Sequence, residues 1–300
     1  MTRSFIWLDV FTDRTYSGNP LAVFPDAAGL SDTQMAQIAR ELNLSETTFV
    51  FPADDPAATH RVRILTPTRE LPFAGHPTVG TAVALAALER VAHGVGGVSD
   101  EFDFVFELSA GLTPVSVRRL ADGSMEAAFV APQTPRLSAS PIDTGALAEA
   151  IGLTAGDLDA SVPVHLSDSG GTVFLMTVVN SMDALRRCHL ERPLPDVVGV
   201  YIACRTGGGW QSRMFAPDAG VVEDPATGSA TCSFAGTLHA FVDGYATEGT
   251  HEVFLRQGVE MGRPSALSLS FDVLDGAISQ VRLRGSAVVI LRGELEVPAG

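Results

Sequence analysis

The chain of 300 residues has few cysteines, few basic side chains and no long apolar run. Its cysteines, Cys188, Cys204 and Cys232, are odd in number and far apart, which is typical of free thiols in a reducing cytoplasm. The net charge of −15 argues against nucleic acid or an anionic membrane as a partner. No segment approaches the roughly 18 apolar residues that a membrane-spanning helix needs. We therefore expect a soluble, cytoplasmic protein.

Motifs that bind metals or nucleotides are also missing. The seven histidines include no HExxH pair, and no Cys-x-x-Cys spacing occurs, so we expect no metal site. The glycines at 94–97 do not form a GxGxxG fingerprint, and there is no GxxxxGK[ST] loop. Ser229 does not lie in a GxSxG nucleophile elbow. The sequence therefore gives no support for a metal site or for nucleotide binding.

What the chain does contain is a motif that occurs twice. Residues 63–82 read RILTPTRELPFAGHPTVGTA, and residues 213–230 read RMFAPDAGVVEDPATGSA. Both copies begin with Arg-x-x-x-Pro and end with Pro-x-x-Gly-[Thr/Ser]-Ala. The beginnings align at an offset of 150 residues (213 − 63), whereas the ends align at 148 (225 − 77), which places His76 opposite Asp224. Such a duplication suggests one active site that is shared between two similar halves.

Each copy predicts the start of a helix. His76 or Asp224 would lie near the N-cap, with Pro77 or Pro225 in the first turn. The uncovered N–H groups at a helix start attract anions, so two such starts facing each other would hold a carboxylate-bearing molecule. The alternative is that both are ordinary capped helices, but the repetition argues against it.

Short strands alternate with turns and a few helices, which predicts an α+β fold in two lobes. Strands are expected at 5–11, 21–24, 47–51 and 61–65, with a helix over about 31–41. The proline-rich stretch 131–141 is the best linker candidate. The expected lobes are therefore 1–130, possibly joined by a C-terminal strand at 282–300, and 142–281. The hydrophobic content of 46% is ample for two cores.

Four residues are candidates for chemistry, and each also has a structural interpretation. Glu46 is expected on a short turn, where carboxylates are commonly solvated. His76 is expected to be neutral, because a helix N-terminus disfavours the imidazolium, or it is simply a cap. Asp224 suits an N-cap, and Ser229 is either a hydroxyl that faces a ligand or a packed small residue. None of the four decides the function alone.

The segments SGNPLAVF, LNLSETTFVF, the two repeats and RQGVEMGRPS, in this order, closely resemble the phenazine-biosynthesis PhzF family of isomerases. The resemblance runs from about Phe5 to Gly293. It implies a fold like that of diaminopimelate epimerase, with two pseudo-symmetric lobes, each a curled, mostly antiparallel sheet around a central helix, and an active site in the cleft between them. Members of the family work without metal or organic cofactor and are commonly homodimers, so we expect a homodimer that acts on a small carboxylate substrate.

The resemblance also implies roles for single residues. The matching motif positions make Glu46 the catalytic acid/base, with His76 and Asp224 completing the catalytic set. The substrate-binding residues would be Gly75, Thr78, Gly228 and Ser229. Moving a proton between two carbons needs a base that then becomes the acid, and burial would raise the pKa of such a carboxylate toward the working pH. A single carboxylate can therefore serve both steps.

The substrate implied by the phenazine enzyme is trans-2,3-dihydro-3-hydroxyanthranilate or a related cyclic or amino acid. Two alternatives stay open. One is an isomerase or epimerase of the same fold that acts on an unrelated small acid. The other is a non-catalytic binding protein that retains the cleft. Related racemases carry a pair of cysteines at the two helix starts, and their absence here argues against classical amino-acid racemisation.

Overall fold

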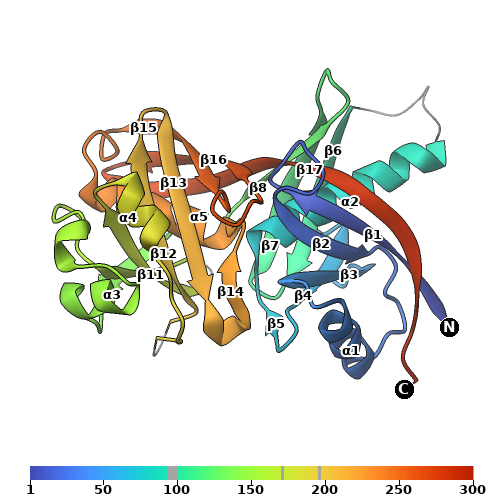
Figure 1. Ribbon diagram of the computed structural model, residues 1–300. Coiled ribbons are helices and arrows are strands. Elements are labelled where there is room, and N and C mark those ends of the chain that lie inside the picture. The colour runs from blue at the N-terminus through green and yellow to red at the C-terminus, as the bar shows by residue number, and fades with distance from the viewer. Residues whose placement is uncertain (94–99, 170–171, 195–196, 300) are drawn as a thin grey trace. The chain divides into compact units, whose positions relative to one another are not determined.

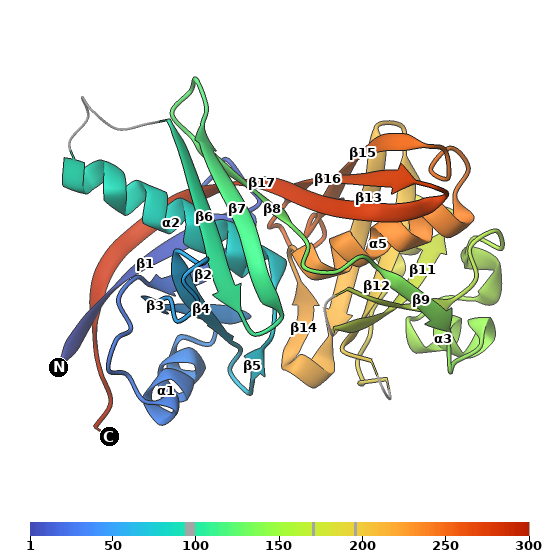
Figure 2. The ribbon, with the colours of Figure 1, turned by 180° about the vertical axis from the view of Figure 1, so that it is seen from behind.

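The computed structural model describes residues 1–93, 100–169, 172–194 and 197–299. The chain divides into two compact units, one of Met1–Pro132 with Arg284–Gly300 and one of Gln133–Leu283. Figure 1 shows the elements of each unit and Figure 2 shows them from behind. None of the helices among these residues is long and apolar enough to span a membrane.

The first unit is a mixed sheet around one central helix. Strands β1 and β2 are antiparallel, β2 and β3 are parallel, and β4 pairs in parallel with β6, which continues through antiparallel β7 and β8. Strand β1 also pairs with the end of β17, so the two chain termini lie side by side. Its elements are β1 (Thr2–Val10), β2 (Asn19–Phe24), α1 (Asp32–Leu42), β3 (Glu46–Pro52), β4 (His60–Leu65), β5 (Glu70–Leu71), α2 (Gly75–His93), β6 (Glu101–Leu108), β7 (Gly111–Arg119) and β8 (Met125–Val130).

Helix α2 is the core of this unit. It runs behind β6 and β7 in Figure 2 and packs against β1, β2, β7 and β8. Its residues 79–87 are small or apolar and are buried on every side. A helix that is apolar all round has no face to offer to water, so the sheet curls around it.

The second unit repeats this plan around α5. Parallel pairs join β11 to β12 and β13 to β15, and antiparallel pairs join β9 to β10, β10 to β11, β12 to β13, β13 to β14 and β15 to β16. Its elements are β9 (Arg136–Ala139), α3 (Thr144–Ala150), a 3₁₀ turn (Ala155–Asp157), β10 (His165–Asp168), β11 (Val173–Val179), α4 (Met182–Arg187), β12 (Gly199–Thr206), β13 (Gly209–Ala216), a second 3₁₀ turn (Pro217–Ala219), β14 (Val221–Asp224), α5 (Gly228–Phe241), β15 (Gly249–Gln257), β16 (Ser265–Leu274) and β17 (Ala277–Glu296).

Strands β9 and β17 do not fit a division of the chain at the expected linker, residues 131–141. The stretch 131–141, expected as a linker, contains β9, which pairs with β10 and so belongs to the sheet of the second unit. The last residues of β17, from Arg284 on, belong to the first unit, where they pair with β1. Strand β9 is therefore the first strand of the second unit, and β17 ends in the first unit.

Strand pairing corrects the alignment of the two repeats. Ile64 pairs with Leu71 in the first unit, and Met214 pairs with Asp224 in the second. Asp224 therefore matches Leu71, at an offset of 153 residues (224 − 71). The central helices begin at Gly75 and Gly228, which have the same offset.

His76 consequently matches Ser229, and its expected match with Asp224 is wrong. The reason is in the sequence: the first copy contains Pro-x-x-Gly twice, at Pro72 and again at Pro77, and Pro225 matches the earlier one. Asp224 is also not an N-cap, because it ends β14 and the N-cap of α5 is Thr227.

In each unit one arginine connects the turn before the central helix to an earlier helix, α1 or α4. Arg63 donates two hydrogen bonds to Glu70, at 2.8 and 2.5 Å, and a third to Asp32 at the first residue of α1. Arg213 donates two to Glu223, both at 2.8 Å. The remaining Arg213 nitrogen, Nη1, donates to three carbonyl groups at the end of α4, those of Leu185, Arg186 and Cys188.

The Arg213 pair should contribute far more to stability than the Arg63 pair. Arg213 and Glu223 have side chains that are 9% and 13% exposed, whereas those of Arg63 and Glu70 are 25% and 34% exposed. We expect Arg213→Met to cost about 3–5 kcal/mol, because it leaves a buried carboxylate unpaired, and Arg63→Met to cost about 1 kcal/mol. Urea unfolding of both variants measures the difference, and equal losses would contradict this assignment.

Candidate active site

Glu46 lies at the edge of the sheet where β2 and β3 both begin. It is the first residue of β3, not a turn residue, and it pairs with Leu21 across the parallel β2–β3 ladder. Asn19, the first residue of β2, is therefore at the same edge. The Glu46 side chain is 16% exposed, so it is accessible but largely removed from water.

His76 reaches this edge from the second position of α2. Its Nδ1 lies 3.2 Å from Nδ2 of Asn19, and Oδ1 of Asn19 accepts a hydrogen bond from the Ser45 hydroxyl, also at 3.2 Å. This orients the amide so that its NH₂ group donates to Nδ1 of the imidazole. The ring proton is thus assigned to Nε2, which lies 3.4 Å from Oε2 of Glu46.

The imidazole of His76 is neutral. The side chain is 3% exposed, and desolvation by burial lowers its pKa to about 3. The contact with Glu46 is therefore not an ion pair, and at 3.4 Å it is longer than an ordinary N–H···O hydrogen bond. A neutral N–H donor therefore lies beside the carboxylate of Glu46. With its lowered pKa, the imidazole does not compete with that carboxylate for a proton.

The two other candidates of the first unit lie in the first turn of α2. Gly75 is the first residue of the helix. Thr78 is buried, and its hydroxyl donates to the carbonyl of Ala74 at 2.7 Å. That hydroxyl therefore supports the turn before the helix.

The second unit contributes the turn that precedes α5. Asp224 is 7% exposed, and its Oδ2 accepts a hydrogen bond from the Thr227 hydroxyl at 2.5 Å. Gly228 and Ser229 are the first two residues of α5, and Ser229 is 6% exposed. Ser229 thus takes the place in this unit that His76 takes in the first.

Sequence reasoning missed the residues that support this turn. The Gln257 amide contacts both ends of the turn: Nε2 donates to the Asp224 carbonyl, and Oε1 accepts from the Thr227 N–H. The Ser265 hydroxyl donates to the carbonyl of Pro225 at 2.8 Å. Gly258 has φ +71°, and a Cβ there would lie 2.7 Å from the Pro225 carbonyl oxygen. All three lie in or beside the segment RQGVEMGRPS, which carried only the family resemblance.

The position that Glu46 occupies has no side chain in the second unit. Phe49 pairs with Arg63 and Ile202 with Arg213, so the strand that begins at Glu46 matches the strand that begins at Gly199. A Cβ at Gly199 would lie 2.5 Å from the Phe215 carbonyl oxygen, so the second unit has no room there for a side chain.

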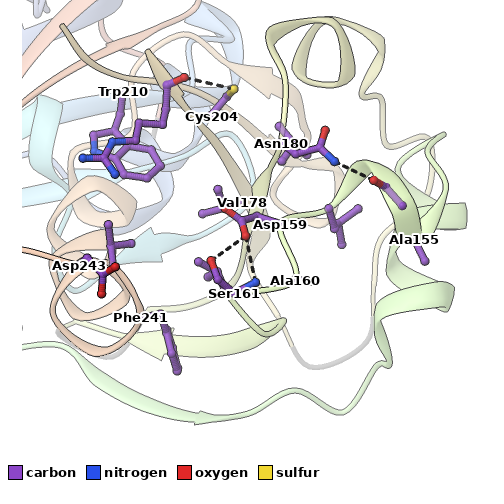
Figure 3. A pocket seen from close by; sticks show the side chains of 16 residues that line it. Ala155, Asp159, Ala160, Ser161, Val178, Asn180, Cys204, Trp210, Phe241 and Asp243 are labelled. Carbon is purple, nitrogen blue, oxygen red and sulfur yellow. Dashed lines mark hydrogen bonds between the residues drawn. The ribbon is translucent and has the colours of Figure 1, made fainter. Parts of the chain in front are cut away.

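A cavity of about 630 Å³ lies elsewhere in the second unit (Figure 3). Its lining includes Asp159, Asn180, Trp210 and Phe241, and it contains none of the predicted site residues. Among the residues that the structure describes, no three His, Cys, Asp or Glu side chains are grouped so that they could hold a metal ion.

Known proteins are similar to this chain over most of its length. Positions 8–293 match the PhzC–PhzF family, described as phenazine biosynthesis-like protein. The chain belongs to the PhzC–PhzF family. It is 36% identical to the trans-2,3-dihydro-3-hydroxyanthranilate isomerase of Pseudomonas chlororaphis, over 97% of this chain and 98% of that protein. Relatives of this kind are isomerases and so is this chain, which sets aside the alternative of a non-catalytic binding protein.

Solved structures confirm the expected fold class. The PhzF-family protein of Bacillus anthracis has a TM-score of 0.84 at 26% identity, covering 99% of this chain and 100% of that one. A hydroxyproline epimerase of Agrobacterium vitis has a TM-score of 0.65 at 12% identity, covering 98% and 91%. The protein thus has the two-lobed α+β fold that PhzF proteins share with the diaminopimelate epimerase-like racemases.

The neutral His76 makes stability depend on pH. Its pKa falls from 6.5 to about 3 on folding, so the unfolded chain binds the proton more readily. The stabilisation is complete above about pH 6.5 and is lost as the pH falls toward 3, by at most about 1.4 kcal/mol per pH unit. We expect His76→Asn to remove this part of the acid destabilisation in urea titrations.

His189→Asn, at an exposed histidine, is the matched control for that titration. It should follow the wild type at every pH. If His76→Asn also followed the wild type from pH 6.5 to 4, His76 would not be buried in its neutral form.

Proposed function

We propose that this isomerase moves a proton within a small carboxylate substrate, with Glu46 as both base and acid. The first candidate substrate is trans-2,3-dihydro-3-hydroxyanthranilate, because relatives with that name are 36% identical over nearly their whole length. A related cyclic or amino acid is the alternative within the same reaction class. In either case one bond from carbon to hydrogen breaks, and another forms at a different carbon of the same molecule.

The observation that carries this proposal is the contact between Glu46 and the neutral His76. A proton shuttle must accept a proton and then release it, so its partner must not hold that proton itself. The pKa of His76, near 3, meets this condition. The imidazole can still donate Nε2–H to the carboxylate or to a polar group of the substrate.

A single shuttle is further supported by the asymmetry of the two units. A mechanism with two bases needs a second acid/base group, and the position that matches Glu46 is Gly199. Asp224 matches Leu71 in the first unit and receives a hydrogen bond from Thr227. We assign Asp224 and Ser229 to holding polar groups of the substrate, together with the N–H groups at Gly75 and Gly228.

Glu46→Gln tests the shuttle directly. The amide keeps the shape of the side chain but cannot accept the proton, so we expect kcat to fall by about 10³-fold or more while KM changes little. The assay follows dihydrohydroxyanthranilate in deuterated buffer by absorbance and mass spectrometry. Glu41→Gln, at an exposed position on α1, is the control and should match the wild type.

The fate of a deuterium label helps to distinguish a mechanism with one base from a mechanism with two. A single carboxylate can return the proton that it removed, so a substrate deuterated at the reacting carbon should give product that retains part of the label. Retained label would support a single base, whereas a Glu46→Gln variant that keeps kcat but loses affinity would contradict the proposed role of Glu46.

A further inference from the structure

The turn before α5 contains a closed hydrogen-bond network of three buried side chains. Gln257 is fully buried, and Asp224 and Thr227 are 7% and 8% exposed. The amide Nε2 of Gln257 donates to the Asp224 carbonyl at 2.8 Å and to the Thr227 hydroxyl at 3.0 Å. Its Oε1 accepts from the Thr227 N–H at 3.2 Å, and the Thr227 hydroxyl donates to Oδ2 of Asp224 at 2.5 Å.

This network fixes the direction of every proton in it. Thr227 N–H needs an acceptor, and the Asp224 carbonyl needs a donor, so the Gln257 amide has only one satisfactory orientation. The Thr227 hydroxyl accepts one of the amide protons and has a single proton of its own. That proton goes to Oδ2 of Asp224, which favours the ionised carboxylate.

The fold itself does not require the network. The first unit builds the same turn, from the end of a short strand to a helix that begins four residues later. By the strand registers of the two units, Asp224 matches Leu71 and Gln257 matches Leu108. Thr227, which directly precedes Gly228, matches Ala74 before Gly75. All three polar residues thus replace apolar ones.

We infer that Thr227 and Gln257 are positioning residues that preset Asp224 as an ionised hydrogen-bond acceptor. The group that Asp224 receives would be a donor on the substrate, such as an ammonium or a hydroxyl group. This inference rests on the role of Asp224 in the proposed function. It adds that Gln257, 33 residues further along the chain, holds the backbone carbonyl of Asp224 and the Thr227 hydroxyl that donates to the carboxylate.

The direct test compares Thr227→Val with Thr227→Ser, using dihydrohydroxyanthranilate as the probe. Valine keeps the shape but removes the donor to Asp224, so we expect kcat/KM to fall about tenfold or more and its acidic limb to move up by about one pH unit. Serine keeps the hydroxyl and should restore both values. A Thr227→Val variant with an unshifted pH profile would overturn the inference.

A second measurement needs no substrate and so separates this inference from the proposed function. Thr227→Val should destabilise the protein in urea more at pH 7 than at pH 4, because the lost donor matters most to an ionised carboxylate. In an Asp224→Asn background this dependence on pH should disappear. If it persisted there, Asp224 would not be the group that Thr227 orients, whatever the wild type does with the probe.

A variant that copies the first unit tests whether the network serves folding. Asp224→Leu, Thr227→Ala and Gln257→Leu, combined in one chain, replace the network with the residues that the first unit has at these positions. We expect this variant to fold with a urea midpoint close to that of the wild type and to lack turnover. Failure to fold, while Thr227→Val folds normally, would show that the network serves the structure and would overturn the positioning role.

Discussion

The arginine–glutamate pair at the base of each central helix is the constraint on which the site depends. A guanidinium has five donors in a planar fork, and burial makes any unpaired donor costly. Arg213 satisfies this need with Glu223 and with carbonyl groups at the end of α4, and Arg63 does so with Glu70 and with Asp32 of α1. Each pair thereby ties a hairpin to a helix.

The same pairs determine where the central helices begin. Glu70 lies five residues before Gly75, and Glu223 lies five residues before Gly228. Once each glutamate is held by its arginine, the strand must end and the chain must turn within this short stretch. In both units the glutamate of the ion pair therefore lies next to the residue that ends the strand, five residues before the central helix begins.

The two units share this arrangement but have different side chains at matching positions. The first has a carboxylate and a neutral imidazole at Glu46 and His76, and the second has Gly199 and Ser229 at the matching places. The second in turn has a buried polar network where the first is apolar. Duplication supplied two equivalent turns, and the differences between them separate the proposed proton transfer from the proposed binding of the substrate.

The sequence was sufficient to predict the duplication, a helix in each copy and the α+β class, because these depend on local patterns. It misplaced Asp224 by five residues, since Pro-x-x-Gly occurs twice in the first repeat and only the strand pairing tells which one matches. The partners of His76 and Asp224 were also missed. Asn19 and Gln257 are 57 and 33 residues away, and only the sheet brings them close.

His76 is neutral, as predicted, but the helix N-terminus accounts for only part of the shift in its pKa. The helix N-terminus does disfavour the imidazolium, but this effect amounts to about 1 kcal/mol or less, or under one pH unit. The pKa near 3 requires burial, which comes from the sheet that surrounds α2 and not from the local motif. A histidine at an exposed helix start would titrate near neutrality and would compete with Glu46 for the proton. The sheet that encloses the apolar central helix therefore also supplies the neutral histidine that the proposed shuttle requires.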